Sequence, residues 1–172
     1  TVPELADQVI TQYKPCIVAL NKFDLIPEDV TDEDFIGYIW REMPGLRFAP
    51  LVMLSAFTGE NVIPMLEIVE KLHEESQIRV KTSELNNVMQ DATGRRHPPS
   101  FDSRPGKILY ATQVDVAPPT IALFVNDAAD INDNYRRYLS NQLRDALPFS
   151  NIPLRFVTRR RQRAPQESGG SR

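Results

Sequence analysis

Two short segments of the sequence have residue types that could recognise the base guanine. Asn21-Lys22-Phe23-Asp24 is followed about thirty positions later by Ser55-Ala56-Phe57-Thr58-Gly59. Guanine presents its N1–H and its N2 amino group side by side, and the ionised carboxylate of Asp24 could accept from both. Adenine lacks this donor pair, so a site built on that carboxylate would reject it by roughly 10^4 or more. The two segments therefore predict binding of a guanine nucleotide, GTP or GDP.

The remaining residues of the two segments would complete the pocket. Asn21 would support the loop and reach the other edge of the base, while the stem of Lys22 would lie over its face. Ser55 and Ala56 would close the pocket. The alternative is an ordinary turn after a strand, since Asn and Asp favour turns. Chance would place the first tetrapeptide in ~2% of chains this long, and both motifs in order in well under ~1%, which favours the pocket.

Both segments follow predicted strands. Residues 16–20 and 50–54 are short apolar runs of the kind found in buried parallel strands. Apolar residues at helical spacing predict helices over 32–43 and 62–78, and the first residues resemble the end of another helix. The order helix, strand, helix, strand, helix over 1–76 predicts an α/β fold, as the last part of a doubly wound sheet of the P-loop GTPase type. Ligands of such sheets bind at the carboxyl ends of strands, where both motifs lie.

The sequence has no phosphate-binding loop of the form Gly-x-x-x-x-Gly-Lys-Ser/Thr, which holds the phosphates and magnesium in nucleoside triphosphatases. Its one Gly-Lys pair, Gly106-Lys107, has Phe101 in place of the first glycine and Ile108 in place of the hydroxyl. Asp91-Ala92-Thr93-Gly94 has the letters of a magnesium motif, but it comes after the guanine motif and is typical of a helix end. We therefore predict no catalytic or metal-binding residue here and no GTP hydrolysis by this chain alone. Magnesium is expected only together with parts N-terminal to it.

The composition favours a cytoplasmic protein with no membrane contact. The chain has 172 residues, of which 41% are hydrophobic, and it begins at Thr1 without an initiator methionine. We therefore expect it to be a portion of a longer protein. No apolar run approaches the ~20 residues that cross a bilayer, and no secretory signal is present. The single Cys16 lies in a predicted strand, where a buried thiol is inert, as in a reducing compartment.

Charge is distributed unevenly along the chain. Residues 1–76 carry 14 Asp and Glu against 5 Lys and Arg, whereas residues 77–172 carry 9 against 15. Formal charges of −9 and +6 predict two domains, the second with an anionic partner such as RNA. We place a GTPase portion at 1–76, a second domain at 77–158 and a basic tail of disordered composition at 159–172.

The second half has the element order α-β-β-α-β. The pattern predicts helices over 82–94 and 133–146 and strands over 107–116, 120–126 and 152–158. This order and size match a KH-like domain, a module that often holds single-stranded RNA. RNA-holding KH domains clamp the backbone with a Gly-x-x-Gly loop, and none lies between the helices here. We therefore expect docking in place of RNA clamping by that loop.

Arginines are the better candidates for RNA or ribosome contact. The run Arg159-Arg160-Arg161, with Arg155 nearby, could neutralise phosphates and release counterions, which makes affinity fall steeply with salt. The predicted helix over 133–146 adds two arginines on its solvent side, Arg136 and Arg137. The alternative is that the run is only a solvated tail.

Several of these segments resemble one family, the bacterial ribosome-assembly GTPases called Der or EngA. Besides the guanine motifs, the resemblance rests on Lys107-Ile108-Leu109-Tyr110-Ala111-Thr112-Gln113, Pro118-Pro119-Thr120, Leu123-Phe124-Val125-Asn126, Tyr135-Arg136-Arg137-Tyr138-Leu139 with Asn141 and Arg144, and Ile152-Pro153-Leu154-Arg155. It implies the second half of the second GTPase domain followed by a KH-like domain. It also implies GTP-dependent assembly of the large ribosomal subunit, with rRNA and ribosomal proteins as partners and packing against the other GTPase domains.

A different class of function stays open at this point. The chain could be a stand-alone RNA or protein interaction module that does not depend on nucleotide, with the first half as a relic. Salt-sensitive RNA binding that is indifferent to GTP or GDP would distinguish this alternative from a GTPase portion.

Overall fold

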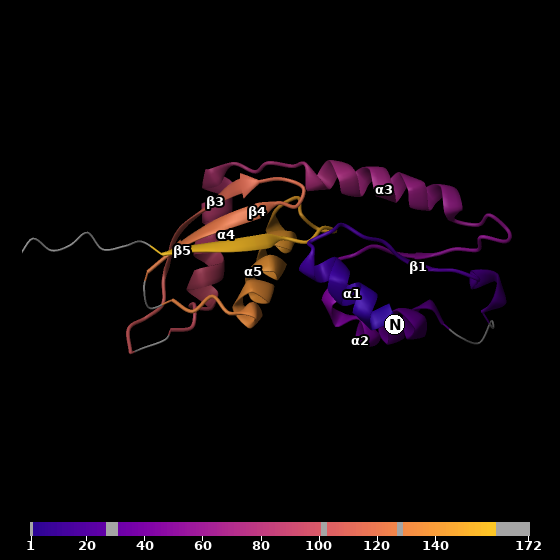
Figure 1. The fold of residues 1–172 in the computed structure, drawn as a ribbon, viewed down its shortest axis with the longest axis horizontal. Coiled ribbons are helices and arrows are strands. Elements are labelled where there is room, and N and C mark those ends of the chain that lie inside the picture. The colour runs from indigo at the N-terminus through magenta and orange to yellow at the C-terminus, as the bar shows by residue number, and fades with distance from the viewer. Residues whose placement is uncertain (1, 27–30, 101–102, 127–128, 161–172) are drawn as a thin grey trace, which may run out of the picture.

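The computed structural model describes residues 2–26, 31–100, 103–126 and 129–160. Figure 1 shows two parts along the long axis, one with the N-terminal helices and one with a three-stranded sheet. The elements are α1 Val2–Thr11, β1 Val18–Leu20, η1 Phe23–Leu25, α2 Asp32–Glu42, η2 Pro44–Leu46, β2 Leu51–Met53, α3 Val62–Ser76, α4 Thr82–Arg95, β3 Ile108–Asp115, β4 Thr120–Val125, α5 Asp133–Ala146 and β5 Arg155–Arg160. No helix within these ranges has the length and apolar character that a membrane span requires.

The N-terminal part contains a sheet of two short parallel strands. Val18 pairs with Leu51 and Leu20 with Met53. Both predicted strands form and are parallel, but they are shorter than the ranges 16–20 and 50–54 predicted for them. The prediction that both are buried was wrong for β1, whose residues are half-buried or exposed. The reason is that, among the described residues, β1 pairs only with β2, so the wider doubly wound sheet stays a prediction.

Short-range signals set the ends of α2. The Thr31 hydroxyl accepts from the backbone N–H of Asp34 at 3.2 Å and lies 2.7 Å from the Asp34 carboxylate. This is an N-cap, which satisfies one of the free N–H groups of the first turn. The helix ends at Glu42, two residues before Pro44. A small cluster around buried Leu46 joins α1 to this region.

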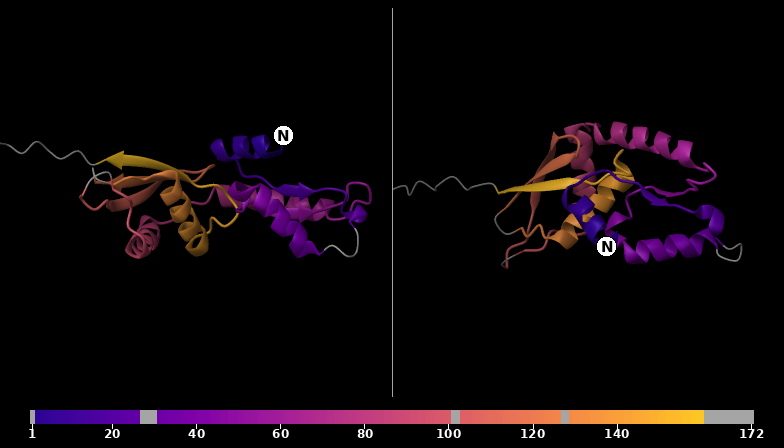
Figure 2. Two further views of the ribbon diagram at one scale, coloured as in Figure 1. Left: turned by 90° about the horizontal axis from the view of Figure 1, so that it is seen from below. Right: turned by 45° about the vertical axis from the view of Figure 1, so that its right-hand side comes forward.

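The C-terminal part is built on the sheet β3-β4-β5. β4 is its central strand, antiparallel to β3 and parallel to β5. One face of β4 presents Ile121, Leu123 and Val125, all fully buried, to the main core. α4 and α5 supply the other side of that core, and the left view of Figure 2 shows both helices on the same side of the sheet. A mixed α/β fold is confirmed.

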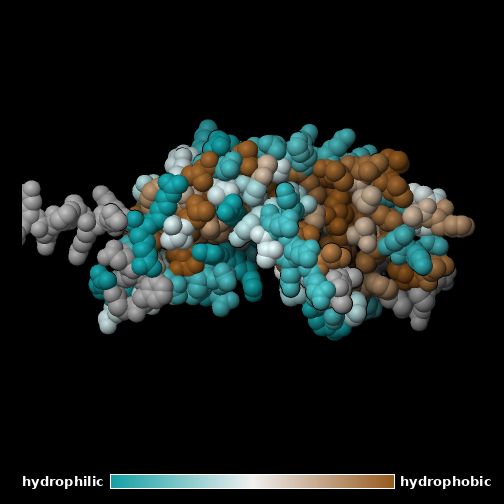
Figure 3. All heavy atoms as spheres, in the orientation of Figure 1, coloured by the Kyte–Doolittle hydropathy of each residue, from teal (hydrophilic) through white to brown (hydrophobic). Residues whose placement is uncertain are grey.

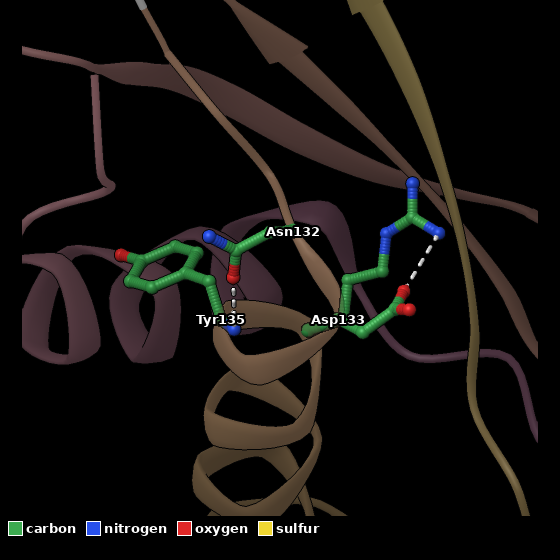
Figure 4. A network of polar contacts seen from close by, with 4 residues as sticks. Asn132, Asp133 and Tyr135 are labelled. Carbon is green, nitrogen blue, oxygen red and sulfur yellow. Dashed lines mark hydrogen bonds and ion pairs between the residues drawn. The ribbon is translucent and has the colours of Figure 1, made fainter. Parts of the chain in front are cut away.

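The predicted helix over 133–146 is confirmed as α5, and its start is fixed by a polar network (Figure 4). The Asn132 side chain accepts from the backbone N–H of Tyr135 at 3.0 Å, and Arg136 lies 3.7 Å from the Asp133 carboxylate. Of the four residues at helical spacing predicted to face inward, Tyr135, Leu139 and Leu143 are fully buried and Tyr138 is half-buried. The Tyr135 hydroxyl donates to the carbonyl of Arg96 at 2.8 Å.

The last strand differs from its predicted range. β5 runs over Arg155–Arg160, whereas 152–158 was predicted. Ile152 and Leu154 are buried in the core but precede the strand, because β4 begins only at Thr120, the partner of Arg155. The strand therefore includes Arg159 and Arg160, which the sequence placed in the tail. Arg161 and the rest of that predicted tail lie outside the described residues.

Side-chain amides satisfy the outer edge of β3. Asn86 of α4 donates to the carbonyl of Ala111 and accepts from its N–H, both at 2.8 Å. Further along, the Gln113 side chain accepts from the N–H of Val80 and donates to the carbonyl of Ile78, both at 2.9 Å. The segment between α3 and α4 is thereby tied to the sheet. An edge strand otherwise presents unpaired backbone groups.

Candidate guanine-binding site

The two segments predicted to recognise guanine meet at the ends of β1 and β2. The side-chain oxygen of Asn21 accepts from the backbone N–H of Lys22 at 2.8 Å and from that of Ala56 at 3.0 Å. The second bond joins residues 35 positions apart in the chain. Asn21 therefore supports the loop, as the sequence predicted. The structure brings both segments to one edge of the sheet.

The backbone after Asn21 turns sharply into a 3-10 helix. Lys22 has φ 66° and ψ 34°, a left-handed conformation that few non-glycine residues adopt, and it precedes η1. The N–H of Phe23 donates to the carbonyl of Leu54 at 3.1 Å, a second tie between the two loops. Asp24 lies in η1 with an exposed side chain. Its carboxylate is thus accessible to a ligand.

The second segment forms a compact turn around Ser55. Ser55 is fully buried, and its hydroxyl accepts from the N–H of Thr58 at 3.2 Å. Its backbone N–H donates to Glu60 at 3.1 Å, and its carbonyl accepts from Gly59 at 2.9 Å. Ser55 therefore stabilises the loop from its buried side, while Ala56 is exposed at the surface of the loop. The neighbouring Phe57 is 94% exposed.

Sequence reasoning missed Asn61 as part of this arrangement. Asn61 adopts φ 57°, and its side-chain amide donates to the carbonyl of Met53, the last residue of β2, at 2.9 Å. It begins α3 and fixes the direction in which the chain leaves the loop. A signal was available, because Asn is enriched in the left-handed region and follows Gly59, another residue with positive φ.

The described arginines proposed for RNA contact lie on two separate elements. Arg136 and Arg137 belong to α5, whereas Arg155, Arg159 and Arg160 belong to β5. Arg136 is paired with Asp133, and its Nε is buried without a hydrogen bond in the described structure. Arg137 is exposed. The structure thus does not bring the five together, and only the β5 set lines one strand.

The C-terminal part matches a known domain type. Residues 79–159 match the family described as "KH-domain-like of EngA bacterial GTPase enzymes, C-terminal". This chain contains the KH-like C-terminal domain of the Der (EngA) family. The α-β-β-α-β order of residues 82–160 agrees with that assignment. The match ends within β5, one residue before Arg160.

Proteins named GTPase Der are similar to the chain over nearly its whole length. The protein from Trichormus variabilis is 40% identical over 170 residues, which is 98% of this chain and 38% of the relative. That from Natranaerobius thermophilus is 40% identical over 151 residues, 87% of this chain and 34% of the relative. That from Rhodopirellula baltica is 32% identical over 161 residues, which is 94% of this chain and 36% of the relative. The chain therefore spans less than two fifths of the length of these Der relatives.

Proposed function

We propose that this chain is part of a GTP-binding protein that acts in ribosome assembly. Its residues Asn21, Lys22, Asp24, Ser55 and Ala56 would recognise the guanine of GTP or GDP. The observation that carries the proposal is the hydrogen bond from the N–H of Ala56 to the side chain of Asn21, which unites the two motifs at one site. The similarity to proteins named GTPase Der supports it.

The geometry suits recognition of a base. The exposed carboxylate of Asp24 would accept from N1–H and N2 of guanine, and Lys22 would cover the ring with its stem. The backbone of Ala56 lies next to Asn21, so both loops would face the same ligand. The buried hydroxyl of Ser55 would hold the second loop in shape. This set fits the base of GTP or GDP, and it supplies nothing for the phosphates or for Mg²⁺.

These site residues suggest separate roles for the two parts of the chain. We propose that residues 1–76 are the C-terminal portion of a GTPase domain and that the KH-like domain docks on the large ribosomal subunit and its rRNA in the cytoplasm. The parallel pair β1–β2, with a motif at the carboxyl end of each strand, supports the first assignment. Phosphate and magnesium contacts supply most of the transition-state stabilisation in GTP hydrolysis. Hydrolysis would therefore require the longer protein, in which the KH-like domain would also pack against the other GTPase domains.

The test is a change of base specificity. Asp24→Asn, in a protein extended upstream in its gene to include a phosphate loop, exchanges one acceptor oxygen for a donor. The variant should lose affinity for GDP by about 100-fold or more and gain affinity for XDP, because xanthine has an oxygen where guanine has its N2 amino group. Equilibrium binding of fluorescent GDP and XDP measures both.

Asp7→Asn is the matched control, since Asp7 is an exposed carboxylate on α1. It should leave both affinities unchanged. Unaltered GDP preference in Asp24→Asn would refute the guanine site. If the extended protein binds neither nucleotide while the chain still binds RNA, the nucleotide-independent interaction module would be the better description.

A further inference from the structure

The face of the sheet turned away from α4 and α5 carries a row of aromatic and basic side chains. Tyr110 of β3 is paired with Phe124 of β4, and Phe124 is paired with Arg159 of β5. The two rings stack with centroids 4.1 Å apart and planes 9° apart. The guanidinium of Arg159 lies 5.8 Å from the centre of the Phe124 ring. We refer to these three residues as the Tyr110 row.

The row is accessible and has a second cation near it. Tyr110 is 47% exposed although one face of its ring is covered by Phe124, so its opposite face is the one open to a partner. Arg155 lies on the same face of β5 as Arg159, four residues earlier, and is also exposed. Within the three described strands the one acidic residue is Asp115, at the far end of the sheet, paired with Thr120. The stacked pair and both arginines are therefore at the surface together.

A small hollow between the edge of β3 and α4 also has Tyr110 in its lining. Its volume is about 170 Å³, and it is lined by Tyr110 and Leu109 of β3 and by residues of α4 that include Asn86 and Gln90. The amide of Asn86 is fully engaged with Thr82 and Ala111. Gln90 has an exposed side chain, whose amide makes no hydrogen bond to the described residues. An amide can both donate to and accept from the edge of a base.

We propose that this face binds single-stranded RNA, with one base stacked on Tyr110 and the adjoining phosphates held by Arg159 and Arg155. The proposal rests on the RNA partnership of the proposed function and names its contact face. A flat exposed ring stacks on any base, and neighbouring cations neutralise the backbone, which together describe a platform for single strands. The site lies on the open face of the sheet and needs no Gly-x-x-Gly loop.

The test is binding of a fluorescently labelled eight-nucleotide RNA of mixed sequence to the 172-residue chain, followed by anisotropy at low salt and over a salt series. Tyr110→Ala should weaken binding about tenfold, since stacking of one base on an aromatic side chain has an effect of this size. Tyr110→Phe should bind like the parent because the ring remains. Arg159→Ala should reduce the slope of log affinity against log salt by about 0.7 for each phosphate that its guanidinium neutralises in the parent.

Arg41→Ala is the matched control, since it removes an exposed arginine from α2, outside the KH-like domain and outside every proposed contact. It should retain parental affinity. Fluorescence gives a second measurement that keeps an aromatic ring at position 110. In Tyr110→Trp, RNA should quench the new indole emission, while the single Trp40 of the parent, in α2, should give an unchanged signal.

Two results would overturn the proposal. They are RNA binding by Tyr110→Ala equal to that of the parent, and an equal loss of RNA binding in Arg41→Ala and Arg159→Ala. Each leaves the guanine site untouched. Failure of the proposed function would appear instead as absent GDP binding in the extended protein, so the two failures are distinguishable.

Discussion

The two halves of the chain bury their apolar side chains to different degrees. Among the residues that the structure describes, the main core contains 17 buried ones, and of these only Leu72 precedes residue 79. The cluster in the N-terminal half contains three, Ala6, Leu46 and Ala49. The KH-like domain thus supplies all but one of the buried residues of the main core, whereas the half that carries the candidate guanine site has only a small cluster.

The apolar residues of the first half are present but exposed. Ile63, Leu66 and Val69 of α3 are 66%, 52% and 49% exposed. A groove of about 560 Å³ lies beside them, lined mainly by residues 13–17 and the inner side of α3. Figure 3 shows hydrophobic residues gathered on that part of the visible surface. Helical spacing of apolar residues therefore predicts that a helix forms, but it does not predict whether its apolar side chains are buried. This exposure supports the proposal that residues 1–76 belong to a larger domain.

Core truncations should separate the two halves most clearly. Leu139→Ala removes a fully buried side chain from α5 and should lower the free energy of unfolding by about 3 kcal/mol. Leu66→Ala makes the same chemical change on an exposed site of α3 and should cost under about 0.5 kcal/mol. Urea unfolding of the chain measures both. Similar losses would show that the first half has a core of its own.

The junction between the halves depends on Gln113. Gln113→Ala should lower the free energy of unfolding by about 2 kcal/mol, because the N–H of Val80 and the carbonyl of Ile78 lose their partner in a partly buried place. Amide hydrogen exchange at residues 78–80 should accelerate. Gln90→Ala, which alters an exposed glutamine of α4, is the control and should change neither quantity. Unchanged exchange at 78–80 would mean that this amide does not hold the junction.

High pH should destabilise the core of the KH-like domain through Tyr135. Burial, followed by the neighbouring Tyr138, raises the pKa of Tyr135 from 10.0 to about 12. Between these values the folded state retains a proton that the unfolded state has lost, so stability falls as pH rises. The loss should be about 1 kcal/mol between pH 10 and 11. Urea unfolding across pH 9 to 12 should show this slope in the parent and in Tyr38→Phe, an exposed control, and lose it in Tyr135→Phe.

The smallest expected effect concerns a surface contact between the halves. Glu75 accepts from the backbone N–H of Asn151 at 2.7 Å and from its side-chain amide at 3.2 Å. Glu75→Ala should cost about 0.5 kcal/mol because exposed charged contacts are screened. A double-mutant cycle with Asn151→Ala isolates the coupling, and Glu74→Ala serves as the neighbouring control. A coupling above about 2 kcal/mol would show that this contact contributes to the core junction.

The sequence predicted the elements of the KH-like domain well because local signals and tertiary packing agree there. Asn132 is an N-cap, and Tyr135, Leu139 and Leu143 repeat at helical spacing and all face the core. β5 was misplaced, since its start depends on where β4 begins, which is a pairing between distant segments. Burial of β1 was overestimated for a related reason, as an apolar run does not reveal whether a second strand lies beside it.

The candidate site was predicted in outline from the spacing of its motifs. The position of Asn21 and Ser55 after strands indicated that the two loops would meet, and they do. Asn61 and the amide of Gln113 were not identified, because a side chain that bonds to a distant backbone group leaves no periodic pattern in the sequence. The Tyr110 row was equally hidden. Its stacking depends on the register of β3 against β4.

The amide of Asn86 is one position at which chemical ageing would disturb the sheet. Spontaneous hydrolysis converts an asparagine side chain into a carboxylate, which accepts hydrogen bonds and donates none. At Asn86 this would turn a donor that faces the carbonyls of Thr82 and Ala111 into a negatively charged oxygen. Repulsion would then expose the edge of β3, and an exposed strand edge recruits strands from other molecules. Deamidation of Asn86 would therefore leave the edge of β3 more open to pairing with a strand of another molecule.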